Sequence, residues 1–351
     1  MTIPPPSTTE THPARRRWVW LVLKWTLLAL VLAFVAWRAR DLWSSSEEQV
    51  RATEFQWQWL LLAALAYAAG WLPSVWFWQL LMHRLGARLR YRDTARAYYC
   101  GHLGKYIPGK ASVLVIRAAL LKDRGFRPSA AALTVAYETL VMMGTGIALG
   151  LAAVPLLFPN VDASRFPLAT RWIGRSLEWM VAHPFVPALV LGGACLAALP
   201  LVGRLFTRIA TKMTPRDALE SQGPVGIDGW VLSAGVIAFA AAWALHGLSL
   251  GCTLQAVTPV AADARFPWED WATWTGAVAL ATALGFAALF APGGIGVREL
   301  ILMEALAAQA EIAAAPAVVA PVFLRIVWFG TEIVVACVLY YAVRPAARSD
   351  E

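Results

Sequence analysis

Long, mostly apolar runs are the feature that most restricts how this chain can fold. The runs 18–37 (WVWLVLKWTLLALVLAFVAW) and 230–257 (WVLSAGVIAFAAAWALHGLSLGCTLQAV) both exceed the roughly 18 residues that indicate a membrane-spanning helix. Of the whole chain, 59% is hydrophobic and 15% is charged, whereas soluble domains carry about 45–50% apolar and about 25% charged residues. The sequence therefore predicts an all-α, polytopic membrane helical bundle.

The remaining apolar runs predict how the chain is organised. Residues 1–14 and 346–351 are predicted to be cytoplasmic tails, the first of them disordered. Residues 15–345 are predicted to form a single transmembrane domain, with a repeat of two halves expected at about 15–160 and 161–345. With the two runs above, the further candidates predict six to eight spanning helices. These candidates are 57–82, 129–158, 185–203, 271–290, 300–315 and 318–343.

The distribution of basic residues predicts the orientation of the chain. Residues 83–128 hold eleven Lys and Arg against Asp93 and Asp123, and such an excess marks the cytoplasmic side of a membrane. The arginines at 15–17 and the basic residues after the last run fall on the same side, and the acidic 258–270 loop falls opposite. Both termini are therefore predicted to be cytoplasmic.

Two segments interrupt the helical pattern with proline and glycine, which break the helical hydrogen-bond ladder. One is 97–121, around GKYIPGK, and the other is 291–299, APGGIGVRE. Broken backbone at membrane depth persists only where protein or a water-filled cavity satisfies it. One break in each half is typical of two related halves around a midplane site. Two topologies stay open for 271–290 and 300–315: both cross fully, or both dip in from outside as a re-entrant pair.

The stretch 104–112, GKYIPGKAS, is one residue short of the phosphate-binding loop G-x-x-x-x-G-K-[ST], because Ala111 replaces the hydroxyl that binds magnesium. No connecting segment is long enough for the soluble α/β domain that such a loop requires, so we reject a nucleotide site. A helix break that carries cations fits better, since exposed amides and cationic side chains attract phosphate. Lys105, Lys110 and Arg117 are the candidates, and the alternative is that they only set orientation.

Several charges lie deep in apolar runs, where each costs about 2.5–3.5 kcal/mol on insertion scales. They are therefore predicted to pair or to line a polar pathway, and purely structural pairing stays open as the alternative. Arg325 and Glu332 are about 10 Å apart along one helix, so each is expected to have its partner on another helix. The other charges of this kind are Glu138, Arg298 and Glu299.

The cysteines and histidines give no sign of a metal site. Neither the four cysteines nor the five histidines show metal-ligand spacing, and the cysteines do not form a disulfide framework. We therefore predict no metal and no cofactor. His246, alone in its apolar run, is expected to be a hydrogen-bonded core residue.

Three motifs resemble the marks of a known family. GKYIPGK followed by Arg117, the glutamate of AYETL, and APGGIGVREL occur in the order expected of integral membrane proteins related to the transmembrane region of lysylphosphatidylglycerol synthase, often called flippase-like. The resemblance covers about 15–345, with one departure. Thr139 stands directly after Glu138, where members often carry arginine.

The resemblance implies a bilayer-embedded fold with re-entrant segments, and movement of a lipid across the inner membrane of a prokaryote. Two-domain members of the family also carry a soluble aminoacyl-transferase domain. No such domain is expected here, so the chain is expected neither to synthesise aminoacylated lipid nor to be an enzyme.

The leading functional hypothesis is transport of a lipid with an anionic phosphate headgroup, of the phospholipid or polyprenyl-phosphate type, through a cation-lined cavity inside the membrane. The expected partners are membrane lipids and not nucleic acid. Two alternatives stay open. Converging carboxylates on the outer face would favour a polytopic transferase that uses a lipid-linked donor, and a bundle without a polar cavity would favour a non-transporting assembly partner. The residues predicted to bind the lipid are Lys105, Tyr106, Pro108, Gly109, Lys110, Arg117, Glu138, Pro292, Gly293, Gly294, Gly296, Arg298, Glu299, Arg325 and Glu332.

Overall fold

The structure of the chain is a computed structural model in which every regular element of the described residues is a helix, as predicted. Single positions are also described between 26 and 40 and between 189 and 208. The continuous stretches that the structure describes are 55–87, 89–106, 112–121, 128–165, 167–187, 228–258, 266–288 and 294–343.

Four helices of the described part are long and apolar enough to cross a membrane, and they confirm four of the predicted spans. The first is divided at Trp71, ahead of Pro73, whose nitrogen has no hydrogen to donate to the helical ladder. The predicted spans 18–37 and 185–203 fall largely outside the described residues, so the total number of crossings stays a prediction. The four helices are α3–α4 (Trp57–Gly70 and Leu72–Arg84), α7 (Pro128–Ala152), α12 (Gly229–Val257) and α15 (Ala314–Ala342).

The two predicted interruptions each separate a pair of short helices. In the first hairpin, α5 (Tyr91–His102) continues into a 3₁₀ turn (Leu103–Tyr106) and is followed by α6 (Ser112–Leu121). In the second hairpin, α13 (Trp271–Ala287) is followed by α14 (Val297–Ala307). The 11 residues of α14 extend about 16 Å, well short of the roughly 30 Å of a bilayer core.

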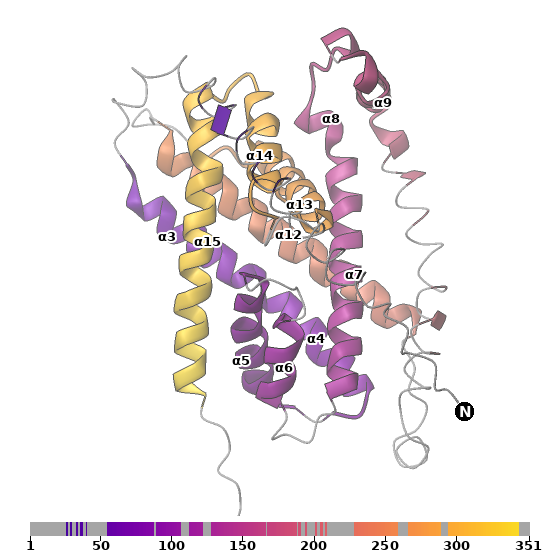
Figure 1. Ribbon diagram of the computed structural model, residues 1–351, viewed down its shortest axis with the longest axis vertical. Coiled ribbons are helices and arrows are strands. Elements are labelled where there is room, and N and C mark those ends of the chain that lie inside the picture. The colour runs from indigo at the N-terminus through magenta and orange to yellow at the C-terminus, as the bar shows by residue number, and fades with distance from the viewer. Residues whose placement is uncertain are drawn as a thin grey trace, which may run out of the picture.

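The long helices hold the two hairpins together. Figure 1 shows α7 and α15 along the long axis of the molecule, with α3 and α12 running obliquely to it. The central helix α12 packs against α3, α4, α7, α13 and α15, while α7 and α15 each contact both hairpins. Beyond the end of α7 lie the short α8 (Val154–Leu157) and the amphipathic α9 (Arg171–Ala182).

The order of elements recurs along the chain. A long helix, two short helices and another long helix occur as α3–α4, α5, α6 and α7, and again as α12, α13, α14 and α15. This recurrence is the arrangement expected of two related halves, although their relationship stays a prediction.

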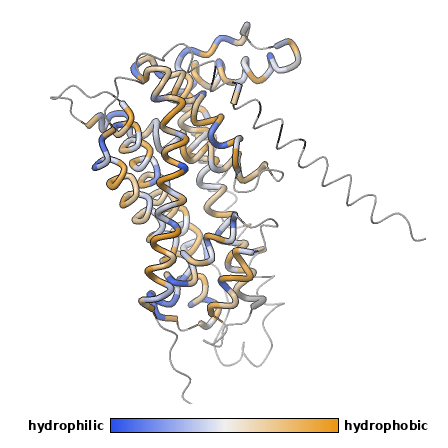
Figure 2. The backbone as a smooth tube through the Cα atoms, turned by 60° about the vertical axis from the view of Figure 1, so that its left-hand side comes forward, coloured by the Kyte–Doolittle hydropathy of each residue, from blue (hydrophilic) through white to orange (hydrophobic). Residues whose placement is uncertain are grey.

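The surface of the long helices suits a lipid environment. Figure 2 shows mainly hydrophobic residues along these helices, with hydrophilic residues gathered toward the two ends of the molecule. On α15, Ile326, Val334 and Val338 are all more than half exposed. Trp57 and Trp230, at the starts of α3 and α12, are also exposed, as expected of indole rings at the headgroup level.

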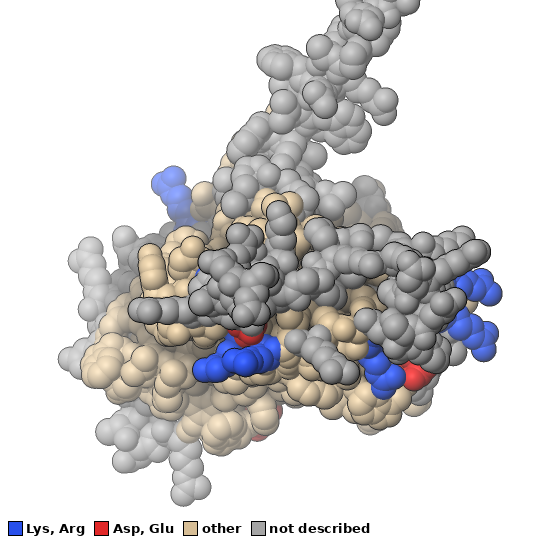
Figure 3. Space-filling model, turned by 90° about the horizontal axis from the view of Figure 1, so that it is seen from below, with Lys and Arg blue, Asp and Glu red and all other residues tan. Residues whose placement is uncertain are grey.

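Charge differs between the two ends of the bundle. Figure 3 views the end at which α5 and α7 begin, and the Lys and Arg side chains visible there outnumber Asp and Glu. Exposed Arg84, Arg90 and Arg92 lie on the described elements of this end. At the other end, Glu269 and Asp270 precede α13, and Glu311 lies between α14 and α15.

Glycines let three helices approach closely at the centre of the bundle. A Cβ atom at Gly150 of α7 would lie 2.7–2.9 Å from the Cβ, Cα and N atoms of Leu280 of α13. A Cβ atom at Gly247 of α12 would lie 2.6 Å from the Cα atom of Thr275 of α13. Small residues that permit such contacts are a common basis of helix packing in membranes.

We predict that Gly150→Ala lowers the free energy of unfolding by about 1–3 kcal/mol, because the added methyl group forces α7 and α13 apart. Gly144 provides the matched control, since it lies in the same helix and a Cβ atom there would meet nothing within 4 Å. Gly144→Ala is expected to leave stability unchanged or slightly higher, because alanine favours the helix. Thermal unfolding of the purified protein in detergent measures both variants, and equal melting temperatures would contradict the prediction.

Candidate functional site

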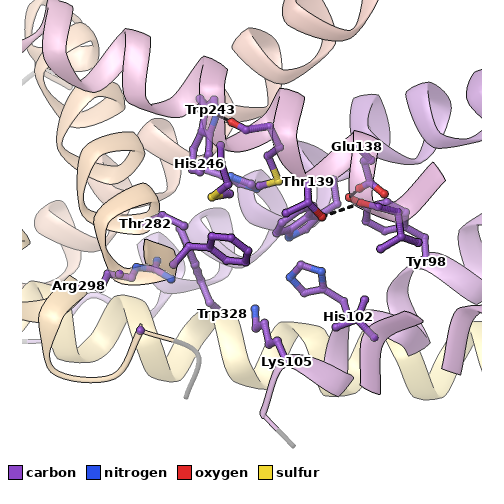
Figure 4. A pocket seen from close by; sticks show the side chains of 18 of the residues that line it. Tyr98, His102, Lys105, Glu138, Thr139, Trp243, His246, Thr282, Arg298 and Trp328 are labelled. Carbon is purple, nitrogen blue, oxygen red and sulfur yellow. Dashed lines mark hydrogen bonds between the residues drawn. The ribbon is translucent and has the colours of Figure 1, made fainter. Parts of the chain in front are cut away.

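A cavity of about 180 Å³ lies where the two hairpins meet, between α3, α7, α12 and α15. Figure 4 shows Lys105 and His102 on one side of it, Arg298 and Thr282 on a second side, and Glu138 and Tyr98 on a third. The two interruptions, far apart in the sequence, thus contribute to one cavity wall. The predicted residues in that wall are Lys105, Arg117, Glu138, Gly294 and Arg298.

The other predicted residues fall into two groups. One group stands next to the wall without belonging to it: Tyr106, Gly296, Glu299, Arg325 and Glu332. The other group lies outside the described residues: Pro108, Gly109, Lys110, Pro292 and Gly293.

Arg117 of α6 is neutralised by Glu138 of α7. Its Nη1 atom donates to Glu138 Oε2 at 2.6 Å, and both side chains are buried. The hydroxyl of Tyr98 donates to the other carboxylate oxygen at 2.5 Å. The guanidinium also lies 3.8 Å from the ring centroid of Tyr98 and 4.7 Å from that of Trp78, a favourable cation–π geometry. A buried cation is tolerated here because a carboxylate and two aromatic faces surround it.

Glu138 has a cationic partner although Thr139, and not an arginine, stands directly after it. The Thr139 hydroxyl donates to the backbone oxygen of Val135 at 2.8 Å, so its hydrogen bond is made within α7. The cation that Glu138 requires comes from Arg117 of the neighbouring helix instead of from the adjacent position in the chain.

Lys105 of the first hairpin pairs with Glu332 of α15. Its Nζ atom donates to Glu332 Oε1 at 2.5 Å, and the Tyr67 hydroxyl donates to the same oxygen. The Nε2 atom of His102 lies 3.8 Å from that oxygen. The expectation that Glu332 has its partner on another element is confirmed, and this pair connects the tip of the first hairpin to α15.

The second hairpin presents Arg298 and Glu299 at the start of α14. Glu299 Oε2 accepts from the backbone N of Gly296 at 2.6 Å, and Glu299 Oε1 accepts from Arg325 at 3.3 Å. The partner expected for Arg325 on another helix is thereby confirmed. Gly294 and Gly296 have φ values of 72° and 89°, a region that favours glycine.

Arg298 differs from the other cavity cations. It is buried, with its guanidinium 4.0 Å from the ring centroid of Trp328. Within the described residues, no carboxylate lies within ion-pair distance of it. Arg117 and Lys105 each have a carboxylate, so the charge of Arg298 is the one left uncompensated in the described cavity wall.

His246 does not behave as the sequence suggested. It is buried in the cavity wall among aromatic rings, with centroids 5.1 Å from Tyr67, 4.9 Å from Trp71 and 5.3 Å from Trp328. Neither ring nitrogen has a hydrogen-bond partner in the part of the chain that the structure describes. His246 is buried as predicted, but the predicted hydrogen bond to its ring is wrong for the described residues.

Sequence reasoning missed the aromatic and neutral polar residues of the wall. A tryptophan or threonine in an apolar run looks the same whether it faces lipid, a neighbouring helix or a cavity. Of these residues, only His246 stands out in the sequence, as an isolated histidine in an apolar run, and that pattern indicates a core residue instead of a cavity residue. The missed wall residues include Tyr67, Trp71, Tyr98, His102, Trp243, His246, Thr282 and Trp328.

The acidic end of the molecule shows a different arrangement. Partial burial raises the pKa of the Asp270 carboxyl above its ordinary value, and the negative charges of Glu311 and Glu269 add to that rise. Within the described residues, no group of three His, Cys, Asp or Glu side chains is arranged to hold a metal ion.

The fold and the cavity define a polytopic helical membrane protein with two interrupted hairpins around an internal, charged cavity. The family model described as "Lysylphosphatidylglycerol synthase TM region" matches residues 21–336, so the chain belongs to that family. Membership makes it a multi-pass membrane protein related to lipid handling. A comparison with curated proteins finds no match.

We predict that Arg117→Gln lowers the free energy of unfolding by about 3–5 kcal/mol, because it leaves the Glu138 carboxylate buried without a cation. Arg117→Met combined with Glu138→Gln is expected to recover most of the loss, since neither position of the pair then carries a buried charge. The control is Arg84→Gln, which breaks an exposed pair with Asp228 and should cost at most about 1 kcal/mol. Urea or thermal unfolding in detergent compares the variants, and equal losses in the Arg117 and Arg84 variants would refute a buried pair.

Proposed function

We propose that this protein moves a lipid with an anionic phosphate headgroup, of the phospholipid or polyprenyl-phosphate type, from one leaflet of the membrane to the other through the cavity between the hairpins. The observation that carries the proposal is the buried guanidinium of Arg298, which lines the cavity without a carboxylate partner among the described residues.

The electrostatics of the cavity support a phosphate ligand. An uncompensated cation inside an apolar bundle is costly, and such residues usually mark a ligand or ion pathway. A phosphate oxygen would form charge-assisted hydrogen bonds with Arg298, which are about twice as strong as neutral ones. Glycines at 285 and 294 let the segment before α14 pack closely against α13 beside Arg298, since added Cβ atoms would lie 3.3 Å from Arg298 Cβ and 3.1 Å from Gly285 Cα respectively.

The hairpins supply the path. We place both of them within the membrane as re-entrant pairs, because α14 is too short to cross and because both hairpins reach the same cavity. Interrupted helices at the interface of two halves are how many transporters expose a central site alternately to each side. Small movements of one hairpin against α7 or α15 would then open the cavity to one leaflet at a time.

The orientation follows from charge. We place the basic end, with Arg84, Arg90 and Arg92, in the cytoplasm, and the acidic end, with Glu269 and Asp270, outside. The end of α15 and the beginnings of α5 and α7 lie at the basic end, so the C-terminus would be cytoplasmic. By family, the membrane would be the inner membrane of a prokaryote.

The cavity at the two breaks is lined by charged side chains. This observation argues against the alternative of a non-transporting assembly partner, because that alternative predicts a bundle without a polar cavity.

The test is translocation of fluorescently labelled phosphatidylglycerol in vesicles reconstituted with the full chain. We expect a rate above that of empty vesicles, and a fall of about 10- to 100-fold for Arg298→Gln, because a lost hydrogen bond to a charged group costs about 1.5–3 kcal/mol. Arg298→Lys should retain part of the activity, since the charge remains.

Arg92→Gln is the matched control, because Arg92 is an exposed arginine on α5 outside the cavity wall. It should translocate lipid like the unmodified protein. If the unmodified chain moves no labelled anionic lipid of either type, or if Arg298→Gln moves it as fast as Arg92→Gln, the proposal fails.

A further inference from the structure

We infer that α9 is an interfacial helix, which lies among the lipid headgroups with its Trp172 and Trp179 side chains toward the acyl chains and binds anionic lipid through Arg171 and Arg175. The occupant of this surface is the leaflet at the end of the molecule opposite α5 and α6 (Figure 1). The surface is separate from the cavity, and the inference does not depend on the proposed function.

The connections of α9 keep it close to a membrane surface. It follows the spanning helix α7, beyond whose end it lies in Figure 1, and the predicted span 185–203 begins just after its last residue, Ala182. It packs against α8 and against the 3₁₀ turn Ala163–Arg165. The Glu178 carboxylate of α9 also accepts from the backbone N of Ala163 at 2.5 Å.

The neighbouring helix α8 is itself fixed to the bundle. Gln309, which follows α14, donates from Nε2 to the backbone oxygens of Leu156 and Leu157 of α8 at 3.1 Å and 2.9 Å. The side chains of Val154 and Leu157 are buried. Because α8 is held by the bundle and α9 is held by α8, protein contacts determine which face of α9 points outward.

The outward face of α9 is aromatic. Trp172 and Trp179 are 67% and 49% exposed, and they lie on the same side of the helix because about two turns separate them. Exposed Ile173 extends this face, whereas Gly174 is buried. Indole rings prefer the headgroup level of a membrane. A helix with such a face and a polar edge is typical of helices that lie in the plane of the interface.

Cations flank the aromatic face. Arg171 and Arg175 lie about one turn apart on one edge of the helix, and no described carboxylate is within ion-pair distance of either. Glu178 is the one acidic residue of α9, and the Ala163 amide already binds it. The edge is therefore positively charged. An acidic soluble partner would match the arginines but leave the tryptophans in water, whereas an anionic lipid surface accommodates both.

Fluorescence quenching in vesicles reconstituted with the full chain tests the inference. A genetically encoded dansyl-bearing amino acid replaces Ser176, which is exposed and lies between the two tryptophans. The vesicles contain phosphatidylcholine and phosphatidylglycerol with a nitroxide quencher either near the headgroup or near the end of the acyl chain, and iodide is the quencher in water. We expect the shallow nitroxide to quench position 176 most strongly.

Two further positions calibrate the depth. Ile326 lies near the middle of the spanning helix α15 and is more than half exposed, so the same fluorophore there should be quenched most by the deep nitroxide. Ala182 is an exposed residue of α9 about two turns from Arg175, on the charged edge. A fluorophore at position 182 should be quenched more by iodide than one at position 176.

The lipid preference is measured by placing the shallow nitroxide on one lipid at a time, at equal mole fractions. Labelled phosphatidylglycerol should quench position 176 about fivefold more effectively than labelled phosphatidylcholine, as expected for a basic residue at an anionic surface. Arg171→Gln combined with Arg175→Gln should make the two lipids equal while the depth stays shallow. Arg84→Gln, at the opposite end of the bundle, is the control and should leave the preference unchanged.

Several results would overturn the inference. Strongest quenching by iodide at position 176 would place the aromatic face in water, and strongest quenching by the deep nitroxide would place it among the acyl chains. Protection from all three quenchers would show that protein, such as a second copy of the chain, covers the face. Equal quenching by the two labelled lipids in the protein with both arginines would remove the anionic preference. Because none of these measurements requires transport, they stand whether or not the chain translocates lipid.

Discussion

The requirement that buried charges be balanced governs how the rest of this structure is arranged. Two hairpins place cations in the middle of an apolar bundle, where an isolated charge is expensive. Carboxylates from the long helices balance two of these cations, Glu138 from α7 and Glu332 from α15. Each pair therefore balances a charge and also fixes a hairpin to a neighbouring helix. Both pairs hold the first hairpin, and the pair between Glu299 of α14 and Arg325 of α15 holds the second. The cavity lies between the two hairpins that these pairs hold in place.

Close packing of small residues makes these pairs possible. The side chain of Arg117 lies against Gly101, and a Cβ atom at Gly104 would lie 2.6 Å from the backbone N of Val113. The arms of the first hairpin thus approach each other without intervening side chains. This packing gives Gly104, the first glycine of GKYIPGK, a structural role that is unrelated to the nucleotide-binding loop whose spacing the motif resembles.

The two hairpins are connected to the following long helix by ion pairs of reversed polarity. Arg117 of α6 pairs with Glu138 of α7, whereas Glu299 of α14 pairs with Arg325 of α15. The first pair is buried at 2.6 Å and the second is partly exposed at 3.3 Å. Because Glu299 faces Arg325 and the Gly296 amide, the adjacent Arg298 keeps its charge for the cavity. The proposed phosphate site depends on this difference between two otherwise similar halves.

The sequence by itself determined the all-α membrane class, four of the spans and the position of both interruptions. These features are local, since run length, proline and glycine act within a few residues of the chain. The sequence also indicated which charged side chains would be buried, because their neighbours along the same run are apolar.

Only the tertiary structure decided which charges pair and which one stays uncompensated. Arg117 and Glu138 are separated by 21 positions and Lys105 and Glu332 by 227, and no local pattern encodes such distances. The same holds for Trp71, His246 and Thr282, which come from distant parts of the chain and line one cavity. Side-chain direction in a bundle depends on how each helix is rotated against its neighbours, and that rotation is set by packing contacts between distant parts of the chain.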